Sequence, residues 1–366
     1  MGTDSEQTEV HVRKAKVDEY RIVQRRIEAL HDGEVLFHVD RFAVTANNVT
    51  YAVFGDVMKY WNFFPSGDAD WGVVPVWGFG DVVESRCEGV GEGDRYYGYF
   101  PMASHLVVQP AGIRPTGMFD GAEHRRELHS VYNNYVRVAS DSSYSVEREP
   151  EQMLLRPLFT TSFLIDDFLA DNEMFGAQTV ILSSASSKTA YGAAFCLHQR
   201  SGVRVVGLTS ERNREFTESL GCYDQVHTYD EIGDLTPESS VYVDLAGSAT
   251  VRMAVHTVLG DHLNYDCAVG GTHWDDRAGG GPLPGPRPQM FFAPAQVSKR
   301  HADWGHAGFE ERLGASWTAF LEQVAAKDQP WMRIESVNGA TSVADCFVAQ
   351  ARGTALPEIG YIAQFS

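Results

Sequence analysis

A turn built from small residues has the composition of a phosphate-binding site. Residues 182–192 read Leu-Ser-Ser-Ala-Ser-Ser-Lys-Thr-Ala-Tyr-Gly, and they join an apolar strand expected over 179–182 to a helix expected over 190–199. Small side chains let backbone N–H groups approach a phosphate, and the N-terminus of a helix adds a favourable dipole. The candidate phosphate-binding residues are Ser184, Ala185, Ser186, Ser187, Lys188 and Thr189.

A second polar group follows about 20 residues later, the spacing at which dinucleotide-binding folds recognise a ribose. There the next expected strand, over 203–208, ends in Thr209, Ser210, Glu211 and Arg212. An acidic residue at this place binds the 2′-hydroxyl of NAD, whereas hydroxyls and an arginine suit the 2′-phosphate of NADP. Although Glu211 weakens the interpretation, the sequence predicts NADP as the cofactor.

The same turn is open to a purely structural interpretation. It has no glycine between Ser183 and Tyr191, so it departs from the G-x-G-x-x-G fingerprint, and packing alone would also explain its small residues. A P-loop is disfavoured, because Leu182 and Ser187 stand where that motif has glycines.

Serine hydrolase chemistry is a further alternative. Ser186, Asp244 and His273 follow one another in the chain order of a hydrolase triad. The nucleophile elbow, however, has glycines two residues to either side of its serine, and here Ser184 and Lys188 occupy those positions. A hydrolase is therefore the less favoured interpretation.

Composition excludes several classes of partner. The chain has 366 residues, with 30 Lys and Arg against 49 Asp and Glu, and a net charge of −19 disfavours binding to nucleic acid. No run approaches the roughly 18 apolar residues of a membrane span, and the polar N-terminal residues lack a signal-peptide core. The five cysteines are isolated from one another, so no metal site is expected. We expect a cytoplasmic protein without a metal, nucleic-acid or membrane partner.

The elements that must position these residues change in character along the chain. Residues 21–30 are expected to form a short helix, and residues 33–100 alternate as short strands separated by Gly- and Asp-rich turns, which indicates a β-barrel-like module. Residues 119–153 are polar and form a connector with an expected helix over 123–138. From residue 154, strands and helices alternate, which predicts a parallel sheet.

Short motifs also follow one another in a characteristic order along residues 30–366. Residues 33–39 read Gly-Glu-Val-Leu-Phe-His-Val, and residues 93–98 read Gly-Asp-Arg-Tyr-Tyr-Gly. Ser184–Ser186 falls at the place of a G-A-[SA]-G-G-V-G turn, and residues 244–247 match D-x-x-G. In this order the motifs resemble those of the medium-chain dehydrogenase/reductase superfamily, on its zinc-free, quinone-oxidoreductase-like side. The likeness is closest to a bacterial family of unknown function within that group.

The resemblance implies an α/β fold with two domains, a GroES-like β-barrel and a Rossmann domain with a doubly wound parallel sheet. The GroES-like substrate domain is expected to comprise residues 1–155 and 327–366, and the dinucleotide-binding domain residues 156–326. Zinc-containing members carry G-H-E where residues 77–81 read Trp-Gly-Phe-Gly-Asp, so the resemblance implies a zinc-free protein. It also implies a homodimer.

The resemblance further implies which residues lie at the nicotinamide. Asn48 and Tyr51 are expected beside the ring as hydrogen-bond donors, with Tyr60 as a further catalytic candidate and Tyr135 as a weaker one. The additional cofactor-binding residues that the resemblance implies are Leu245, Gly270 and Thr272.

These expectations combine into a hypothesis about the reaction. We expect an NADP-dependent oxidoreductase that transfers a hydride to a carbonyl or α,β-unsaturated carbonyl compound. The aromatic residues of segment 51–71 predict an apolar or aromatic substrate. A lyase or isomerase on the same scaffold and a cofactor-binding protein without catalytic activity both remain alternatives.

Overall fold

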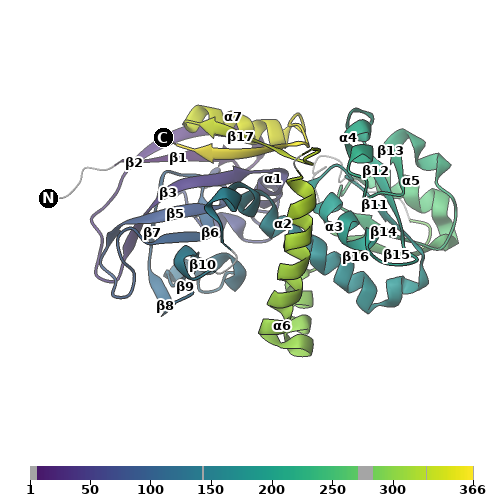
Figure 1. The fold of residues 1–366 in the computed structure, drawn as a ribbon. Coiled ribbons are helices and arrows are strands. Elements are labelled where there is room, and N and C mark those ends of the chain that lie inside the picture. Colours follow the sequence, from purple (N-terminus) through teal and green to yellow (C-terminus); the bar gives the residue numbers. More distant parts are fainter. Residues whose placement is uncertain (1–5, 142–143, 271–282, 327, 366) are drawn as a thin grey trace. The chain divides into compact units, whose positions relative to one another are not determined.

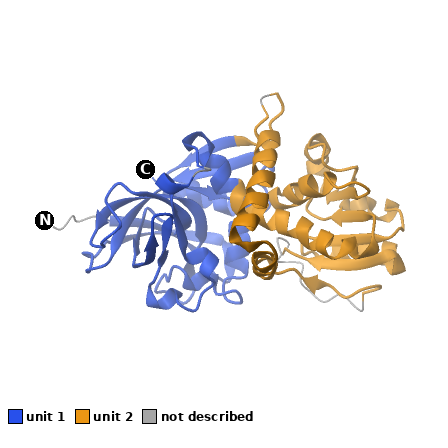
Figure 2. Cartoon of the chain, turned by 60° about the horizontal axis from the view of Figure 1, so that its bottom comes forward, with its two compact units in different colours: residues 1–154, 334–366 blue, residues 155–333 orange. Residues whose placement is uncertain are grey.

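The computed structural model describes residues 6–141, 144–270, 283–326 and 328–365 (Figure 1). The chain divides into two compact units, one of residues 1–154 and 334–366, and the other of residues 155–333 (Figure 2). Within the described ranges, no helix is both long enough and apolar enough to cross a membrane.

The first unit contains two sheets. The smaller has the order β2-β1-β4. The larger has the order β17-β18-β3-β5-β6-β10-β9-β8, with β7 paired to β3. The strands are β1 (Glu6–Arg13), β2 (Lys16–Arg26), β3 (Val35–Val44), β4 (Trp71–Val73), β5 (Pro75–Ser85), β6 (Arg95–Pro101), β7 (His105–Val108), β8 (Pro110–Arg114), β9 (Gly117–Asp120), β10 (Asn134–Arg137), β17 (Arg333–Asn338) and β18 (Ile359–Gln364). Two helices accompany them, α1 (Ala46–Val53) and α7 (Ala340–Ala351).

The helix expected over residues 21–30 is wrong. Residues 21–26 belong to β2, which pairs antiparallel with β1 from Glu6 opposite Arg26 to Val12 opposite Tyr20, and residues 27–30 form neither helix nor strand. Exposure alternates with a period of two along Ile22–Arg26, as a strand requires. The sequence of residues 21–26 is rich in charged residues and shows no alternation of apolar and polar residues. The strand forms because the segment pairs with β1, and local sequence does not reveal that pairing.

The helix expected over residues 123–138 is also wrong. The connector forms short 3-10 turns, Glu123–Arg125 and Ser130–Asn133, and then joins the larger sheet as β10 between β6 and β9. Tyr135 on β10 is fully buried, and its hydroxyl donates to the carbonyl oxygen of Tyr99 at 2.8 Å. Pairing with strands distant in sequence outweighs the local helical pattern.

The second unit is built on a parallel sheet of order β13-β12-β11-β14-β15-β16, which confirms the predicted α/β architecture. Its strands are β11 (Thr179–Leu182), β12 (Arg204–Thr209), β13 (Gln225–Thr228), β14 (Ser240–Asp244), β15 (Leu263–Ala268) and β16 (Gln289–Met290). Its helices are α3 (Lys188–His198), α4 (Arg214–Ser219), α5 (Ala249–Leu259), α6 (Ala293–Val324) and most of α2 (Glu149–Asp171).

Strand order reverses direction between β11 and β14. From β11 the chain proceeds outward through β12 and β13, and it then returns to the other side of β11 with β14. In doubly wound sheets the loops that follow two such strands diverge, and ligands bind in the crevice beyond their carboxyl ends. The fold therefore places a ligand site after Leu182 and Asp244.

Candidate functional site

The predicted cofactor-binding residues gather at the carboxyl edge of the parallel sheet. The turn at 183–187 follows β11, residues 209–212 end and follow β12, and Leu245 and Gly270 follow β14 and β15. These strands are neighbours in the sheet, so their ends meet at one edge. Thr272, also predicted, lies outside the described residues.

The turn after β11 has a tight conformation without glycine. Ser184 has a φ of 50°, in the left-handed region that glycine adopts most easily, and it stands at the first glycine of the G-A-[SA]-G-G-V-G pattern. Its N–H donates to the Tyr229 hydroxyl at 3.1 Å, and its carbonyl accepts the N–H of Ser187 at 2.7 Å. Hydrogen bonds thus hold the bend that glycine would otherwise favour.

The start of α3 is suited to an anion. Ser187 is its N-cap, and the Ser187 hydroxyl accepts the N–H of Ala190 at 3.3 Å. The first turn contains Lys188 and no acidic residue, so the positive end of the helix dipole is not neutralised by a carboxylate of its own first turn. This is the electrostatic environment that a pyrophosphate requires.

Gly207 on β12 allows the turn to approach the sheet. A Cβ atom at this position would lie 2.9 Å from the Cβ of Ala185 and 3.0 Å from Cδ1 of Tyr223. Tyr223 in turn donates its hydroxyl to the Ala185 carbonyl at 2.8 Å. A larger residue at 207 would displace the turn from the end of β12.

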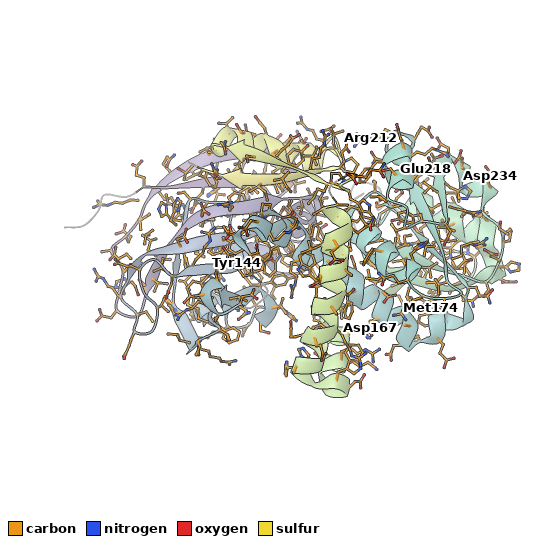
Figure 3. The ribbon with its side chains drawn as sticks, viewed as in Figure 1. Tyr144, Asp167, Met174, Arg212, Glu218 and Asp234 are labelled. Carbon is orange, nitrogen blue, oxygen red and sulfur yellow. The ribbon has the colours of Figure 1, made fainter. Side chains whose placement is uncertain are left out.

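The residues after β12 fit a 2′-phosphate better than a bare ribose. Thr209 is 1% exposed, and among the described residues its buried hydroxyl has no hydrogen-bond partner. The Glu211 carboxylate lies 3.5 Å from the guanidinium of Arg214, so a cation already balances the charge that argued against NADP. Arg212 is exposed on the second unit, where Figure 3 labels it. The residues present are therefore compatible with NADP.

A buried ionic network joins the ends of β11 and β14, and the sequence analysis did not identify it. The Ser183 hydroxyl donates to Oδ1 of Asp244 at 2.9 Å and accepts the N–H groups of Leu245 and Ala246 at 3.0 Å. The second carboxylate oxygen of Asp244 binds the guanidinium of Arg252 on α5. Since Ser183 and Asp244 are both fully buried, this network determines where the two loops leave the sheet.

His256, one turn after Arg252 on α5, extends the network to β15. Its Nε2 lies 2.8 Å from Oδ2 of Asp266, and its Nδ1 lies 2.6 Å from the carbonyl oxygen of Pro284. Both partners are acceptors, so both ring nitrogens must carry a proton and the imidazole is charged. Although burial opposes the charge, the hydrogen bonds to Asp266 and Pro284 raise the pKa of His256 above its ordinary value.

The raised pKa predicts a pH dependence of stability. Below the unfolded-state pKa of about 6.5 the His256 proton is bound in both states, and its stabilising contribution is fully present. We expect that contribution to decrease as the pH rises through the higher folded-state pKa, by at most about 1.4 kcal/mol per pH unit. Urea unfolding at several pH values should show this slope in the wild type, and His256→Gln should lack it; equal slopes in both proteins would contradict the assignment.

Gly270 has a structural reason to be glycine. A Cβ atom there would lie 2.1 Å from the Leu245 carbonyl oxygen, so only glycine lets the loops after β14 and β15 come this close. The contact between Gly270 and the Leu245 carbonyl is therefore explained by packing alone, without a bound cofactor. Contact of either residue with a cofactor stays a prediction.

The hydrolase alternative finds no support among the described residues of the turn. The Ser186 hydroxyl accepts from Nδ2 of Asn213 at 3.0 Å, whereas Asp244 accepts from Ser183 and binds Arg252. His273 lies outside the described residues.

In the first unit, the predicted catalytic tyrosines belong to one aromatic cluster. The ring centroids of Tyr51 and Tyr60 are 4.7 Å apart. Nε1 of Trp77 donates to the Tyr51 hydroxyl at 3.0 Å, and the hydroxyls of Tyr60 and Tyr132 are 3.3 Å apart. The aromatic cluster consists of buried Tyr51, Tyr60, Phe63, Phe64, Val73 and Tyr99, with partly buried Phe54, Trp77, Leu106, Leu128 and Tyr132 around them. Burial raises the pKa of both Tyr51 and Tyr60, so their phenols keep their protons at neutral pH.

Asn48 and Tyr135 have structural partners. Oδ1 of Asn48 accepts the N–H of Thr45 at 2.7 Å, and its Nδ2 donates to the Pro75 carbonyl at 2.9 Å, which fixes the start of α1. The Tyr135 hydroxyl donates to the Tyr99 carbonyl, as described above. A catalytic role for Asn48 therefore stays a prediction, and the same is true of Tyr51 and Tyr60.

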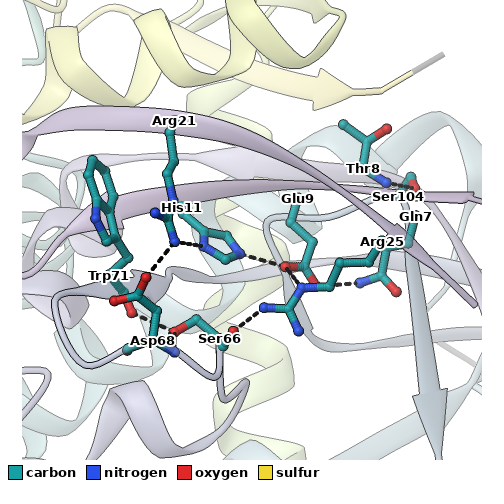
Figure 4. Close-up of polar contacts among 10 residues, drawn as sticks. All are labelled: Gln7, Thr8, Glu9, His11, Arg21, Arg25, Ser66, Asp68, Trp71 and Ser104. Atoms are coloured by element: carbon teal, nitrogen blue, oxygen red, sulfur yellow. Dashed lines mark hydrogen bonds and ion pairs between the residues drawn. The ribbon is translucent and has the colours of Figure 1, made fainter.

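A group of hydrogen bonds and ion pairs joins the N-terminal hairpin to residues 66–68, which lead into β4 (Figure 4). Arg21 on β2 contacts Nδ1 of His11 at 3.4 Å and binds Asp68 at 2.9 Å. Because arginine only donates, Nδ1 must accept, and Nε2 of His11 donates to Glu9 at 2.5 Å. Arg25 adds a hydrogen bond to the Ser66 carbonyl. The N-terminal hairpin of β1 and β2 thus holds residues 66–68 in place through hydrogen bonds to Ser66 and Asp68. This segment begins two residues after Phe64 of the aromatic cluster.

Comparison with known proteins identifies one family. The family described as "Protein of unknown function (DUF2855)" matches residues 42–355. No curated protein matches the sequence.

Solved structures show which fold this is. CurA from Vibrio vulnificus has a TM-score of 0.62 at 13% identity over 99% of both chains, and a second structure of it contains NADPH. The quinone oxidoreductase from Coxiella burnetii has a TM-score of 0.53 at 13% identity, covering 99% of this chain and 100% of that chain. The yhdH oxidoreductase from Salmonella enterica, solved with NADP, has a TM-score of 0.53 at 13% identity, covering 98% and 100%. These likenesses confirm the predicted fold, a GroES-like domain with a Rossmann domain as in medium-chain dehydrogenase/reductases.

Proposed function

Because this chain belongs to the DUF2855 family and has the fold of medium-chain dehydrogenase/reductases, we propose that it is an NADP-dependent, zinc-free oxidoreductase. Its proposed substrate is a small apolar or aromatic molecule with a carbonyl or α,β-unsaturated carbonyl group. The proposal also includes a cytoplasmic location, and a homodimer as the resemblance implies.

The observation that carries the proposal is the group of residues beyond β11 and β12. The N-terminus of α3, with Lys188 and without an acid in its first turn, would hold the pyrophosphate. Thr209, Ser210 and Arg212 would hold the 2′-phosphate, and the unpartnered Thr209 hydroxyl is available for this purpose. The solved relatives that contain NADPH or NADP support the same choice of cofactor.

The chain's own residues would bind the substrate and supply a proton. When bound, the nicotinamide supplies the hydride. Hydride addition to a carbonyl leaves an oxyanion, which takes one proton to become the alcohol. Tyr51 and Tyr60 are the proposed donors, because their buried phenols remain protonated and lie among apolar side chains that exclude water.

Titration of the purified protein tests the first step of this proposal. We expect NADPH to give a saturable signal in calorimetry and in nicotinamide fluorescence, with a weaker signal for NADH. The absence of NADPH binding in both measurements would refute the proposed function. Substrate turnover with bound NADPH, but without a change in nicotinamide absorbance, would instead favour a lyase or isomerase.

A further inference from the structure

A fully buried guanidinium adjoins the aromatic cluster of the first unit. Arg125 is 1% exposed, and its guanidinium carbon lies 4.6 Å from the ring centroid of Phe64 and 5.7 Å from that of Phe63. Both phenylalanines belong to the aromatic cluster. A buried arginine is costly unless its donors are satisfied, so its partners indicate its purpose.

The partners of Arg125 do not use all its donors. Its Nε lies 3.1 Å from Oδ2 of Asp120, which is itself 5% exposed. Its Nη1 donates to the Tyr135 hydroxyl over a long 3.4 Å, and its buried Nη2 has no partner in the part of the chain that the structure describes. Asp120 therefore balances the charge of Arg125, while N–H groups of the guanidinium remain unsatisfied.

A second unsatisfied group belongs to the same cluster. Within the described ranges the Tyr99 hydroxyl is buried without a hydrogen-bond partner, and its ring lies 5.4 Å from that of Phe63. Both residues lie against the same two phenylalanines, because the Arg125 guanidinium and the Tyr99 ring each contact Phe63 and Phe64. Burial raises the pKa of Tyr99, so the hydroxyl remains a donor at neutral pH. Buried polar groups are rarely left unpaired in proteins, and two beside one aromatic cluster indicate an absent partner.

We propose that the Arg125 guanidinium and the Tyr99 hydroxyl bind the oxygen of a small, neutral aromatic ligand whose ring packs among the aromatic cluster. The ligand is neutral because Asp120 already compensates the arginine, and a carboxylate would add an unbalanced buried charge. It is aromatic because the side chains around the two donors are aromatic rings, among them Phe63, Phe64 and Tyr132. The partly buried Phe54, Trp77, Leu106, Leu128 and Tyr132 pack against this cluster.

Arg125 and Tyr135 both come from the connector of residues 119–153. Asn133 of the same segment holds the Arg125 carbonyl through its Nδ2 at 3.0 Å, while its own Oδ1 is buried without a partner. As a substrate site, this inference rests on the proposed function, because the bound oxygen would then be that of the carbonyl to be reduced.

Calorimetry without NADPH tests the site independently of any reaction. The probes are acetophenone, ethylbenzene, which lacks the oxygen, and benzoate, which is charged. We expect acetophenone to bind the wild type about tenfold more tightly than either of the others, as a hydrogen bond from a charged donor provides. Equal affinities for acetophenone and ethylbenzene would overturn the proposal, and so would the tightest binding by benzoate.

Tyr99→Phe removes only the unpartnered hydroxyl. We expect it to weaken acetophenone binding about tenfold and to leave ethylbenzene binding unchanged. Tyr20→Phe on β2, whose hydroxyl binds Asp345, is the matched control and should change neither affinity. Unchanged acetophenone affinity in Tyr99→Phe would overturn the inference. If NADPH fails to bind while acetophenone binds as expected, the reductase proposal fails and the site stands.

Discussion

Arg212→Ala is expected to weaken NADPH binding by about 10- to 100-fold and to leave NADH binding unchanged. Loss of one hydrogen bond to a charged group costs about 1.5–3 kcal/mol, and each 1.4 kcal/mol is tenfold in affinity. The effect is selective because only NADPH carries the 2′-phosphate, which Arg212 is proposed to bind with Thr209 and Ser210. Calorimetric titration of both nucleotides measures it.

A control variant distinguishes recognition of the 2′-phosphate by Arg212 from a general effect of the protein's net charge on nucleotide binding. Arg333→Ala removes an equally exposed positive charge from β17, and it should leave both affinities unchanged. A chain with a net charge of −19 repels a dinucleotide, so a variant that acted only through net charge would change the affinities for NADPH and NADH alike. If Arg212→Ala and Arg333→Ala weaken NADPH binding equally, the 2′-phosphate assignment is wrong.

Asp244→Asn is expected to lower the free energy of unfolding by about 3–5 kcal/mol, the cost of removing one partner from a buried ion pair. The amide cannot compensate Arg252, and it disturbs the hydrogen bonds that join Asp244 to Ser183. Because Ser183 holds the N–H groups of Leu245 and Ala246, we also expect NADPH binding to weaken in this variant. Urea unfolding and calorimetry measure the two effects.

Asp234→Asn provides the control for this variant. Asp234 lies exposed on the same unit, where Figure 3 labels it, and its substitution should change stability by less than about 0.5 kcal/mol. The double variant Asp244→Asn with Arg252→Gln should cost less than the sum of the single variants, since it leaves no unbalanced arginine. A stability loss in Asp244→Asn no larger than that in Asp234→Asn would show that the network does not hold the two loops.

The parallel sheet and its phosphate-binding turn could be predicted because their signals are local. Buried strands such as Thr179–Leu182 read as short apolar runs, and the turn to α3 follows directly in sequence. The positions of Thr209 and Arg212 follow from the same regularity, since every strand of a parallel sheet ends at one edge. The cluster of Tyr51 and Tyr60 was likewise visible as an aromatic-rich segment.

Other parts of the molecule depend on partners far away in the chain. The N-terminal hairpin carries charged residues that resemble a surface helix until β1 and β2 are paired. Arg252, Asp266 and His256 belong to no motif in the sequence, and the D-x-x-G match at Asp244 does not indicate an ion pair. Only burial at the ends of β14 and β15 makes these residues an ionic network. Burial, rather than residue type, is what makes such a charge costly to leave unpaired.

The sequence by itself determined the fold class, the parallel sheet and the residues expected at its carboxyl edge, because periodicity and turn composition act over a few residues. Only the tertiary structure decided that Ser184 bends without glycine, that Ser183 and Asp244 hold two loops together, and that Arg125 and Tyr99 lie unsatisfied beside the same aromatic rings. Those features arise where long-range packing removes water from polar groups, and hydrogen-bond satisfaction in the folded chain then determines which of them is available to a ligand.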